Sequence, residues 1–305
     1  MSPFFKLRLT ETGRSDGSAG AIISTVAACF VTVNDVILKE LLLGLPLMQV
    51  LFLRSTLAVT MLLVCVPFVG GRQKVVPKSW NGTLWLAGLQ VPTLFLFPYS
   101  LSFMPLTTAL VLVYAAPLFV VFISRFVLKR DQIGPRRMMA VAIGFAGAAI
   151  VVNPTFAGFD AVMLIPLFCA LMLAVRDVMT SQVALGSHPL TITMTSMVLL
   201  MIGSGGFVAF EDWQPIAQRD VVMVLASTTF MVVGQLLWVV AFTAAPAYLV
   251  TTIKYSAVIW SLILSYVVWS EIPTLREVVG GLLVILSSIA IVLIRERVAL
   301  TSGKR

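Results

Sequence analysis

The sequence predicts an all-α polytopic membrane protein of ten transmembrane helices, on three observations. Hydrophobic residues make up 59% of the 305-residue chain and charged residues only 11%, whereas a soluble domain carries about 25% charged residues. The mean hydropathy is +1.03. Apolar windows of about 20 residues, the length that crosses a bilayer core, recur between Gly, Pro and charged residues. Lipid is therefore the main solvent expected around this chain.

Ten segments have the length and polarity of spanning helices. We place them at 20–43, 46–69, 82–103, 105–128, 135–153, 159–184, 189–210, 220–243, 246–269 and 274–294. The division between the third and fourth spans depends on a tight turn at Met104-Pro105. No cleavage site follows the first apolar run, so we expect that run to be retained as a helix.

The distribution of Lys and Arg predicts the orientation. With the N-terminus in the cytoplasm, fifteen basic residues fall on the cytoplasmic side and only Lys39, Arg219 and Arg276 on the outer side. This bias, with an even number of spans, puts both termini in the cytoplasm. We therefore expect a multi-pass protein of a bacterial inner membrane, with the lipid bilayer as a partner. The net charge of +8 then reflects topology and not nucleic-acid binding.

The two halves of the chain match each other at a nearly constant offset. A shift of 141 residues takes Tyr114 to Tyr255, and a shift of 142 takes Asn34-Asp35-Val36 to Arg176-Asp177-Val178. Five helices is an odd number, so the second copy must insert upside down relative to the first. This predicts inverted repeats, which place a substrate site near the midplane of the membrane. The predicted parts are a tail at 1–19, a first five-helix repeat at 20–153, a second at 159–294 and a tail at 295–305.

Five ionisable side chains lie well inside the predicted spans, away from their ends, where an unpaired charge is costly and therefore faces the protein interior. At a rise of 1.5 Å per residue, Asp35 and Arg54 reach about the same level in the outer half. Arg176, Asp177 and Lys254 fall in the inner half. Each set is either a structural ion pair or a functional group. We assign coupling or gating to Asp35, Arg54 and Asp177. We assign substrate binding to Lys254 and Arg176, because the surplus positive charge of the inner set would suit a carboxylate.

Aromatic and polar side chains give the predicted site its character. Tyr114 and Tyr255 occupy matching places in spans four and nine, and aromatic walls suit a planar ring or an organic cation. Most aromatic residues of membrane helices, however, only pack or lie at the interface. The other candidate binding residues are Asn34, Phe95, Tyr99, Gln235 and Trp238.

Prolines interrupt three of the predicted spans. Pro92 and Pro98 lie in the third, Pro117 in the fourth and Pro166 in the sixth. Each frees a backbone carbonyl, which is tolerated where the group lines a cavity or finds another partner. We expect either a static kink or a bending point at each position.

Other classes of protein are not expected. The chain has no G-x-x-x-x-G-K-[ST] phosphate loop, and its single histidine excludes an H-E-x-x-H zinc motif. The three cysteines lie in apolar runs without metal-ligand spacing. Asp35 and Asp177 lie in opposite halves of the membrane, too far apart for the shared proton of an aspartyl protease. We therefore expect no enzyme, catalytic residue, metal site or cofactor; an intramembrane enzyme and a channel are minor alternatives.

Short motifs then identify a family. They are Pro105-Leu-Thr-Thr-Ala, Ala116-Pro117-Leu-Phe and Gly144-Phe-Ala-Gly147 in the first half, with Ala245-Pro246-Ala and Glu271-Ile-Pro273 in the second. On these motifs the chain resembles the drug/metabolite transporter superfamily, in its EamA-like branch, from about residue 20 to 295. One departure is Lys129-Arg130, where the family usually has a Glu.

The resemblance implies a secondary transporter with a central cavity lined by spans 1–4 and 6–9. Spans 5 and 10 would lie outside, and the stripe of Ala140, Gly144 and Ala148 suits close helix packing there. The run from Asn34 to Lys39 and the pair Lys254-Tyr255 resemble carriers of S-adenosylmethionine and riboflavin; other relatives carry amino acids.

We therefore expect alternating-access transport of a small zwitterionic or aromatic metabolite, such as an amino acid or a nucleoside-like cofactor, across the inner membrane. An organic-cation or drug exporter is the alternative. A proton or a counter-substrate as coupling partner, and a monomer or a homodimer, are left open.

Overall fold

The computed structural model describes residues 17–65, 80–126, 135–152, 161–182, 189–244, 253 and 255–302. Within these residues every regular element is helical, as the composition predicts. The α-helices are α1 (Gly17–Gly44), α2 (Leu47–Cys65), α3 (Trp80–Leu101), α4 (Leu106–Val113), α5 (Ala116–Phe126), α6 (Pro135–Val152), α7 (Leu164–Gln182), α8 (Pro189–Val208), α9 (Gln218–Ala244), α11 (Ser256–Trp269) and α12 (Leu275–Ser302). A 3-10 turn at Ala161–Met163 precedes α7.

Six segments of the described chain are long and apolar enough to cross a membrane. They are Ala19–Gly44, Leu47–Val64, Trp80–Leu101, Leu106–Ile123, Thr191–Val208 and Gln218–Trp238. Shorter apolar helices cover Met138–Val151, Ala161–Arg176 and Ser256–Trp269. This pattern is that of a polytopic membrane protein, and each of these segments overlaps a predicted span.

Hydroxyl side chains within the apolar helices bond to their own backbone. Ser24 Oγ donates to the Gly20 carbonyl at 2.7 Å, and Thr32 Oγ1 to the Ala28 carbonyl at 2.8 Å. Ser204 on α8 makes the same bond, four residues back, to Leu200 at 2.6 Å. A polar group without a partner is costly in lipid, and this local bond lets Ser and Thr lie in a spanning helix.

The predicted turn between the third and fourth spans is confirmed. Helix α3 ends at Leu101, and the backbone N–H of Ser102 donates to the Tyr99 carbonyl in the turn that follows. Pro105 is the N-cap of α4. Proline suits this place because the first turn of a helix needs no donor from it.

The sequence interpretation of Pro166 was wrong. Pro166 lies in the first turn of α7, which begins at Leu164, so it frees no carbonyl inside the helix. Pro92 and Pro98 do lie inside α3, as predicted. Pro117 is the second residue of α5, where it marks the start of a new helix and not a kink in an old one.

The fourth predicted span is therefore broken into α4 and α5. Tyr114 and Ala115 form the turn between them. The Ala115 N–H reaches back only three residues, to the Leu112 carbonyl at 3.1 Å, and Leu118 N–H bonds to Ala115 in the same way. Because Pro117 has no N–H, the regular i to i−4 ladder cannot continue through this point.

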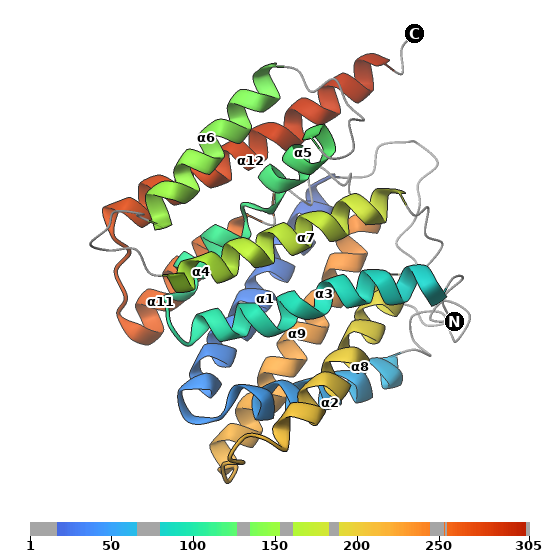
Figure 1. Ribbon diagram of the computed structural model, residues 1–305, viewed down its shortest axis with the longest axis vertical. Helices are drawn as coiled ribbons and strands as arrows, with labels where there is room; N and C mark the ends of the chain where they lie inside the picture. Colours follow the sequence, from blue (N-terminus) through green and yellow to red (C-terminus); the bar gives the residue numbers. More distant parts are fainter. Residues whose placement is uncertain are drawn as a thin grey trace.

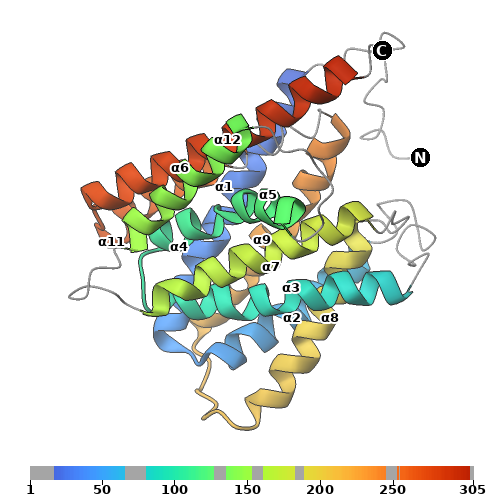
Figure 2. The ribbon, with the colours of Figure 1, turned by 45° about the horizontal axis from the view of Figure 1, so that its top comes forward.

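Helices distant in the sequence pack side by side in the bundle (Figures 1 and 2). α1 packs along α9, α3 along α7, α2 along α8, and α6 along α12. α6 and α12 form a pair at one side of the bundle. A Cβ at Gly147 would lie 2.7 Å from the Gly280 carbonyl oxygen, so only glycine permits this approach. The predicted stripe of Ala140, Gly144 and Ala148 is buried.

Candidate functional site

A hydrogen-bonded group of four side chains lies buried between α1, α2 and α9; we call it the polar cluster. Asn34 is its centre. The Asn34 Oδ1 atom accepts hydrogen bonds from Arg54 Nη2 on α2 and, at 2.9 Å, from Ser227 Oγ on α9. Asn34 Nδ2 in turn donates to Asp35 Oδ1 at 2.9 Å. The structure thus brings Asp35 and Arg54 to the same amide group.

The polar cluster is almost fully removed from the surface. Asn34, Asp35 and Arg54 are 5%, 7% and 6% exposed. Arg54 Nε has no hydrogen-bond partner among the described residues, and Nη2 also lies 3.7 Å from Met231 Sδ. Buried ions are costly, by several kcal/mol each, and no ion pair within 4.0 Å joins Asp35 to Arg54. Retaining two of them therefore points to function rather than to stability.

The α9 side of the polar cluster was missed by the sequence analysis. Ser227 and Met231 are four residues apart, so they lie on the same face of α9. The available signal was the polar run Ser227-Thr228-Thr229 in an apolar span. Thr228 is also buried, and its hydroxyl has no partner among the described residues.

Tyr114 and Tyr255, the pair predicted from the repeat, are in contact. Their ring centroids are 5.4 Å apart, in an edge-to-face arrangement at 64°. Each lies in the turn from which a helix begins, α5 after Tyr114 and α11 after Tyr255. Tyr114 also packs against three hydrophobic groups, those around Leu118 on α5, Leu38 on α1 and Trp238 on α9. The pair therefore lies at a junction of several helices.

Two other candidates, Gln235 and Trp238, lie on α9. Trp238 is buried against α1 with Ala27 and Ala28. Gln235 is half-buried one helical turn earlier. A large ring against small alanines is the packing expected where α1 and α9 approach closely.

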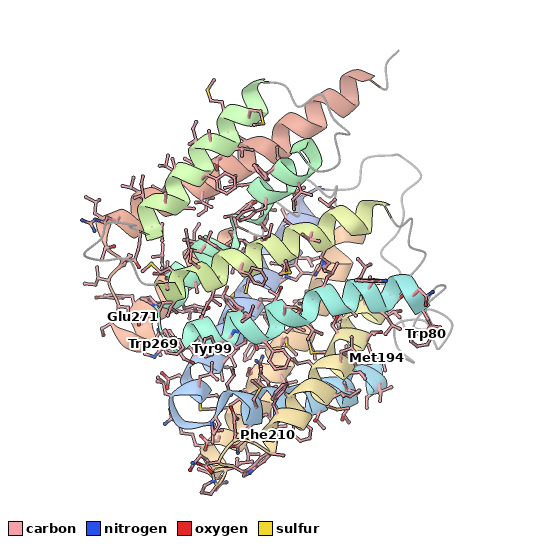
Figure 3. The ribbon with its side chains drawn as sticks, in the orientation of Figure 1. Trp80, Tyr99, Met194, Phe210, Trp269 and Glu271 are labelled. Carbon is pink, nitrogen blue, oxygen red and sulfur yellow. The ribbon has the colours of Figure 1, made fainter. Side chains whose placement is uncertain are left out.

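The candidates on α3 lie elsewhere. Phe95 packs with Met197 and Leu200 of α8. Tyr99 is 42% exposed and its ring contacts Phe103 edge-on at 5.0 Å. Figure 3 labels Tyr99 on α3, near the end that leads to α4.

The structure describes only part of the inner-half group predicted from the sequence, which consists of Arg176, Asp177 and Lys254. Arg176 on α7 is half-buried. Lys254 and the Asp177 side chain lie outside the described residues. Grouping of the three stays a prediction.

A second charged group, which the sequence did not reveal, joins α1 to α9 and to the segment between α11 and α12; we call it the edge network. Lys39 Nζ pairs with Glu271 Oε1 at 2.9 Å and lies 4.3 Å from the centre of the Trp269 ring. Trp269 Nε1 donates to Glu40 Oε1 at 2.5 Å. Arg219, at the start of α9, reaches the other Glu40 oxygen at 3.4 Å. Figure 3 shows Trp269 and Glu271 at one edge of the bundle.

The backbone explains how Glu271 reaches Lys39. Ser270 ends α11 with a φ of 56°, a left-handed conformation that closes a helix and turns the chain. Thr274 directly precedes α12, and Glu277 lies in its first turn. The backbone N–H of each residue donates to the side chain of the other, which forms a capping box. Both ends of the connection are thereby held.

The described residues contain no group of three His, Cys, Asp or Glu side chains that would hold a metal ion. The buried polar groups are instead single charges, amides and hydroxyls. Ligand sites for organic molecules are lined by apolar and aromatic side chains with a few polar groups of this kind.

The family follows from comparison with known proteins. The model of the EamA-like transporter family matches this chain twice, at residues 18–153 and 161–293. The chain belongs to the EamA-like transporter family, within the drug/metabolite transporter superfamily, and is an integral multi-pass membrane protein. The family consists of transporters and not of enzymes.

Several bacterial transporters are similar over most of their length. A pseudopaline exporter of Pseudomonas aeruginosa is 22% identical over 278 residues, 90% of this chain and 95% of that protein. A riboflavin transporter of Vibrio cholerae is 25% identical, over 86% of this chain and 89% of the transporter. An S-adenosylmethionine uptake transporter of Rickettsia conorii is also 25% identical, over 85% and 87%.

A solved crystal structure of a protein shares the fold. It superposes with a TM-score of 0.65 at 16% sequence identity, over 92% of this chain and 99% of the other. At this identity the likeness concerns the fold alone.

Proposed function

We propose that this protein is a secondary transporter that moves a small zwitterionic or aromatic metabolite across a bacterial inner membrane by alternating access. Amino acids and nucleoside-like cofactors are the solutes that fit this description. The observation that carries the proposal is the contact of Tyr114 with Tyr255, from two matching helix starts at a junction of helices. Relatives that carry riboflavin and S-adenosylmethionine support the same class of solute.

An inverted repeat of two five-helix units, 20–153 and 159–294, is part of the proposal. The helix packing supports it, because the most extensive contacts between the two halves map onto one another when the halves are exchanged. Contact of α1 with α9 becomes contact of α7 with α3, and α1 with α11 becomes α7 with α5. The contacts of α2 with α9 and of α8 with α3 are exchanged likewise, while α2–α8 and α6–α12 map onto themselves.

The helix break supports a solute path near the middle of the membrane. Transporters with inverted repeats bind solutes where spanning helices are discontinuous, since the free backbone groups there line a polar site. Tyr114 lies at such a break between α4 and α5. The matching turn at Tyr255 opens α11. The break at Tyr114 and the helix start at Tyr255 would therefore face the same chamber.

The site residues are assigned as follows. We assign substrate binding to Tyr114, Tyr255, Asn34, Gln235, Trp238, Phe95, Tyr99, Arg176 and Lys254. Gating or coupling falls to Asp35, Arg54 and Asp177, with a proton or a counter-substrate as the coupled species. Both termini are cytoplasmic in this proposal, in accord with the distribution of basic residues.

An organic-cation or drug exporter is the second candidate. It is favoured by the aromatic pair, since the faces of aromatic rings attract cations, and by the buried carboxylate of Asp35. The two candidates differ in whether a carboxylate on the solute is required.

The test is counterflow in proteoliposomes that contain the purified full chain. Liposomes are loaded with each of a set of unlabelled solutes: the standard L-amino acids, S-adenosylmethionine, riboflavin and a quaternary amine. Uptake of the labelled solute should then be saturable and should exceed uptake into unloaded vesicles. Equal uptake with and without protein for every member of the set would refute transport of this class.

A further inference from the structure

We infer that Asp35 and Arg54 bind the two opposite charges of a zwitterionic solute, its ammonium group at Asp35 and its carboxylate at Arg54. The inference rests on the proposed transport function and narrows it to solutes in which one carbon joins the two charged groups. It also moves these two residues from gating to direct recognition.

Arg54 has unused hydrogen-bonding capacity toward a carboxylate. Only Nη2 donates to an oxygen of a described residue, the Oδ1 atom of Asn34. Nε has no partner, although the residue is only 6% exposed. No carboxylate oxygen of the described residues lies within 4.0 Å of the guanidinium. A guanidinium binds a carboxylate through two parallel N–H bonds, and the Nε edge offers one of those donors.

Asp35 has unused capacity toward a cation. Its Oδ1 atom accepts one hydrogen bond, from Asn34. No hydrogen bond from a described residue reaches Oδ2, and no Lys or Arg of the described residues forms an ion pair with this carboxylate. An ionised carboxylate accepts several hydrogen bonds. A primary ammonium group, with three donors, would satisfy it.

Asn34 keeps the two charges apart. Its amide oxygen is held by both Arg54 and Ser227, and its amide nitrogen is turned to Asp35. A neutral spacer of this kind works against stability, because a direct pair would offset part of the desolvation cost of each ion. One amide group bridges the guanidinium and the carboxylate, and one carbon joins the ammonium and carboxylate of an α-amino acid. The arrangement is therefore suited to a ligand that carries both charges.

The experiment measures binding to the full-length protein in lipid nanodiscs by calorimetry, first with the standard L-amino acids. The tightest binder is then compared with its amide, which lacks the carboxylate, and with its N-acetyl derivative, which lacks the ammonium. Asp35→Asn and Arg54→Gln are tested beside Ser24→Ala. Ser24 is a matched control because it is buried on the same helix and bonds only to its own turn.

We expect both derivatives to bind wild-type protein about 10- to 100-fold more weakly, the loss typical of a hydrogen bond to a charged group. Asp35→Asn should bind the amino acid more weakly by the same factor. This variant should also bind the amino acid no more tightly than the N-acetyl derivative. Arg54→Gln should lose the preference over the amide. Ser24→Ala should bind like wild type. These paired losses of discrimination distinguish recognition from a general loss of fold, which would weaken all compounds together.

Three results would overturn the inference. One is a derivative that binds wild type as tightly as its parent. Another is an amino acid whose affinity is unchanged in both variants, which would mean that water alone hydrates the two charges. The last is binding of a riboflavin or quaternary-amine probe without binding of any amino acid. After any of these three results the proposed transport function still stands if counterflow is observed. Failure of counterflow for every solute would instead refute both the transport function and the zwitterion inference.

Discussion

Lys39 Nζ lies 2.9 Å from Glu271 Oε1 and joins two residues that are 232 positions apart in the sequence. Their side chains are 10% and 32% exposed, so the pair is shielded more than a surface ion pair. The Trp269 ring lies against the same ammonium group at 4.3 Å. This contact ties α1 to the segment between α11 and α12, at the side that the topology predicts to be the outer one.

Loss of the Lys39–Glu271 ion pair should destabilise the protein. We expect Lys39→Met and Glu271→Gln each to lower the free energy of unfolding by about 1–2 kcal/mol, since both the ion pair and the cation–π contact are partly desolvated. The melting temperature in detergent should fall by about 2–6 °C. The double variant should be little worse than either single one, because the two side chains act through one contact.

Arg276→Ala is the control for the edge network. Arg276 is exposed on the first turn of α12, close to Glu271 in sequence. Its removal should leave the melting temperature within the error of the measurement. Additive losses in the double variant would show that Lys39 and Glu271 act independently.

The polar cluster should be destabilised by removal of its central amide. Asn34→Leu leaves Arg54 and Ser227 without their shared acceptor, at a cost of about 1–3 kcal/mol for each unsatisfied group. Replacing Arg54 by Met in the same chain removes the buried charge and should restore part of the stability. Thermal unfolding in detergent measures both effects, and transport should be absent from both variants. If the double variant melted below Asn34→Leu, the guanidinium would have a second partner that the structure does not reveal.

The α6–α12 contact should tolerate no side chain at Gly147. In Gly147→Ala the new Cβ would lie 2.7 Å from the Gly280 carbonyl oxygen, and overpacking of this kind costs about 1–3 kcal/mol. The melting temperature should drop by several degrees. Gly88→Ala on α3 is the opposite case, because nothing lies within 4 Å of its Cβ. That change should be neutral or stabilising, since alanine favours helix; equal loss in both would contradict the close approach.

The ring of Tyr114 should contribute to solute affinity. Tyr114→Phe keeps the edge-to-face contact with Tyr255, whereas Tyr114→Ala removes it. We expect Tyr114→Ala to raise the half-saturation constant for an aromatic solute by about 3- to 10-fold, because one aromatic contact is lost. Tyr114→Phe should retain most of the affinity. Initial rates of counterflow measure both, and a loss as large in Tyr114→Phe would assign the effect to the hydroxyl group.

Much of the fold could be predicted from local features. Apolar windows located the helices, and Pro105 located the turn before α4. A constant offset between the halves matched Tyr114 with Tyr255, and the structure shows that the two rings are in contact. Rise per residue predicted that Asp35 and Arg54 would reach the same level, and the structure links them through one amide. Each of these depends only on residue type, spacing or length.

The remaining features depend on packing between distant segments. Asn34 was a candidate binding residue, but its position between two charges requires α2 and α9 to approach α1 at one point. The partner of Lys39 comes from a turn that Ser270 makes in a left-handed conformation, which composition does not predict. The break at Tyr114 replaced a predicted continuous helix, because Pro117 was interpreted as a kink. No periodicity within one span contains this information.

Alternating access can be tested by measuring whether the polar cluster is reached by a reagent from each side of the membrane. In a chain whose native cysteines are replaced, Ser227→Cys places one thiol on α9 beside Asn34. Right-side-out and inverted vesicles are treated with a membrane-impermeant thiol reagent. An alternating-access carrier predicts labelling from both sides, slowed by a transported solute in both. Labelling from one side only, with no protection by any solute, would contradict the account.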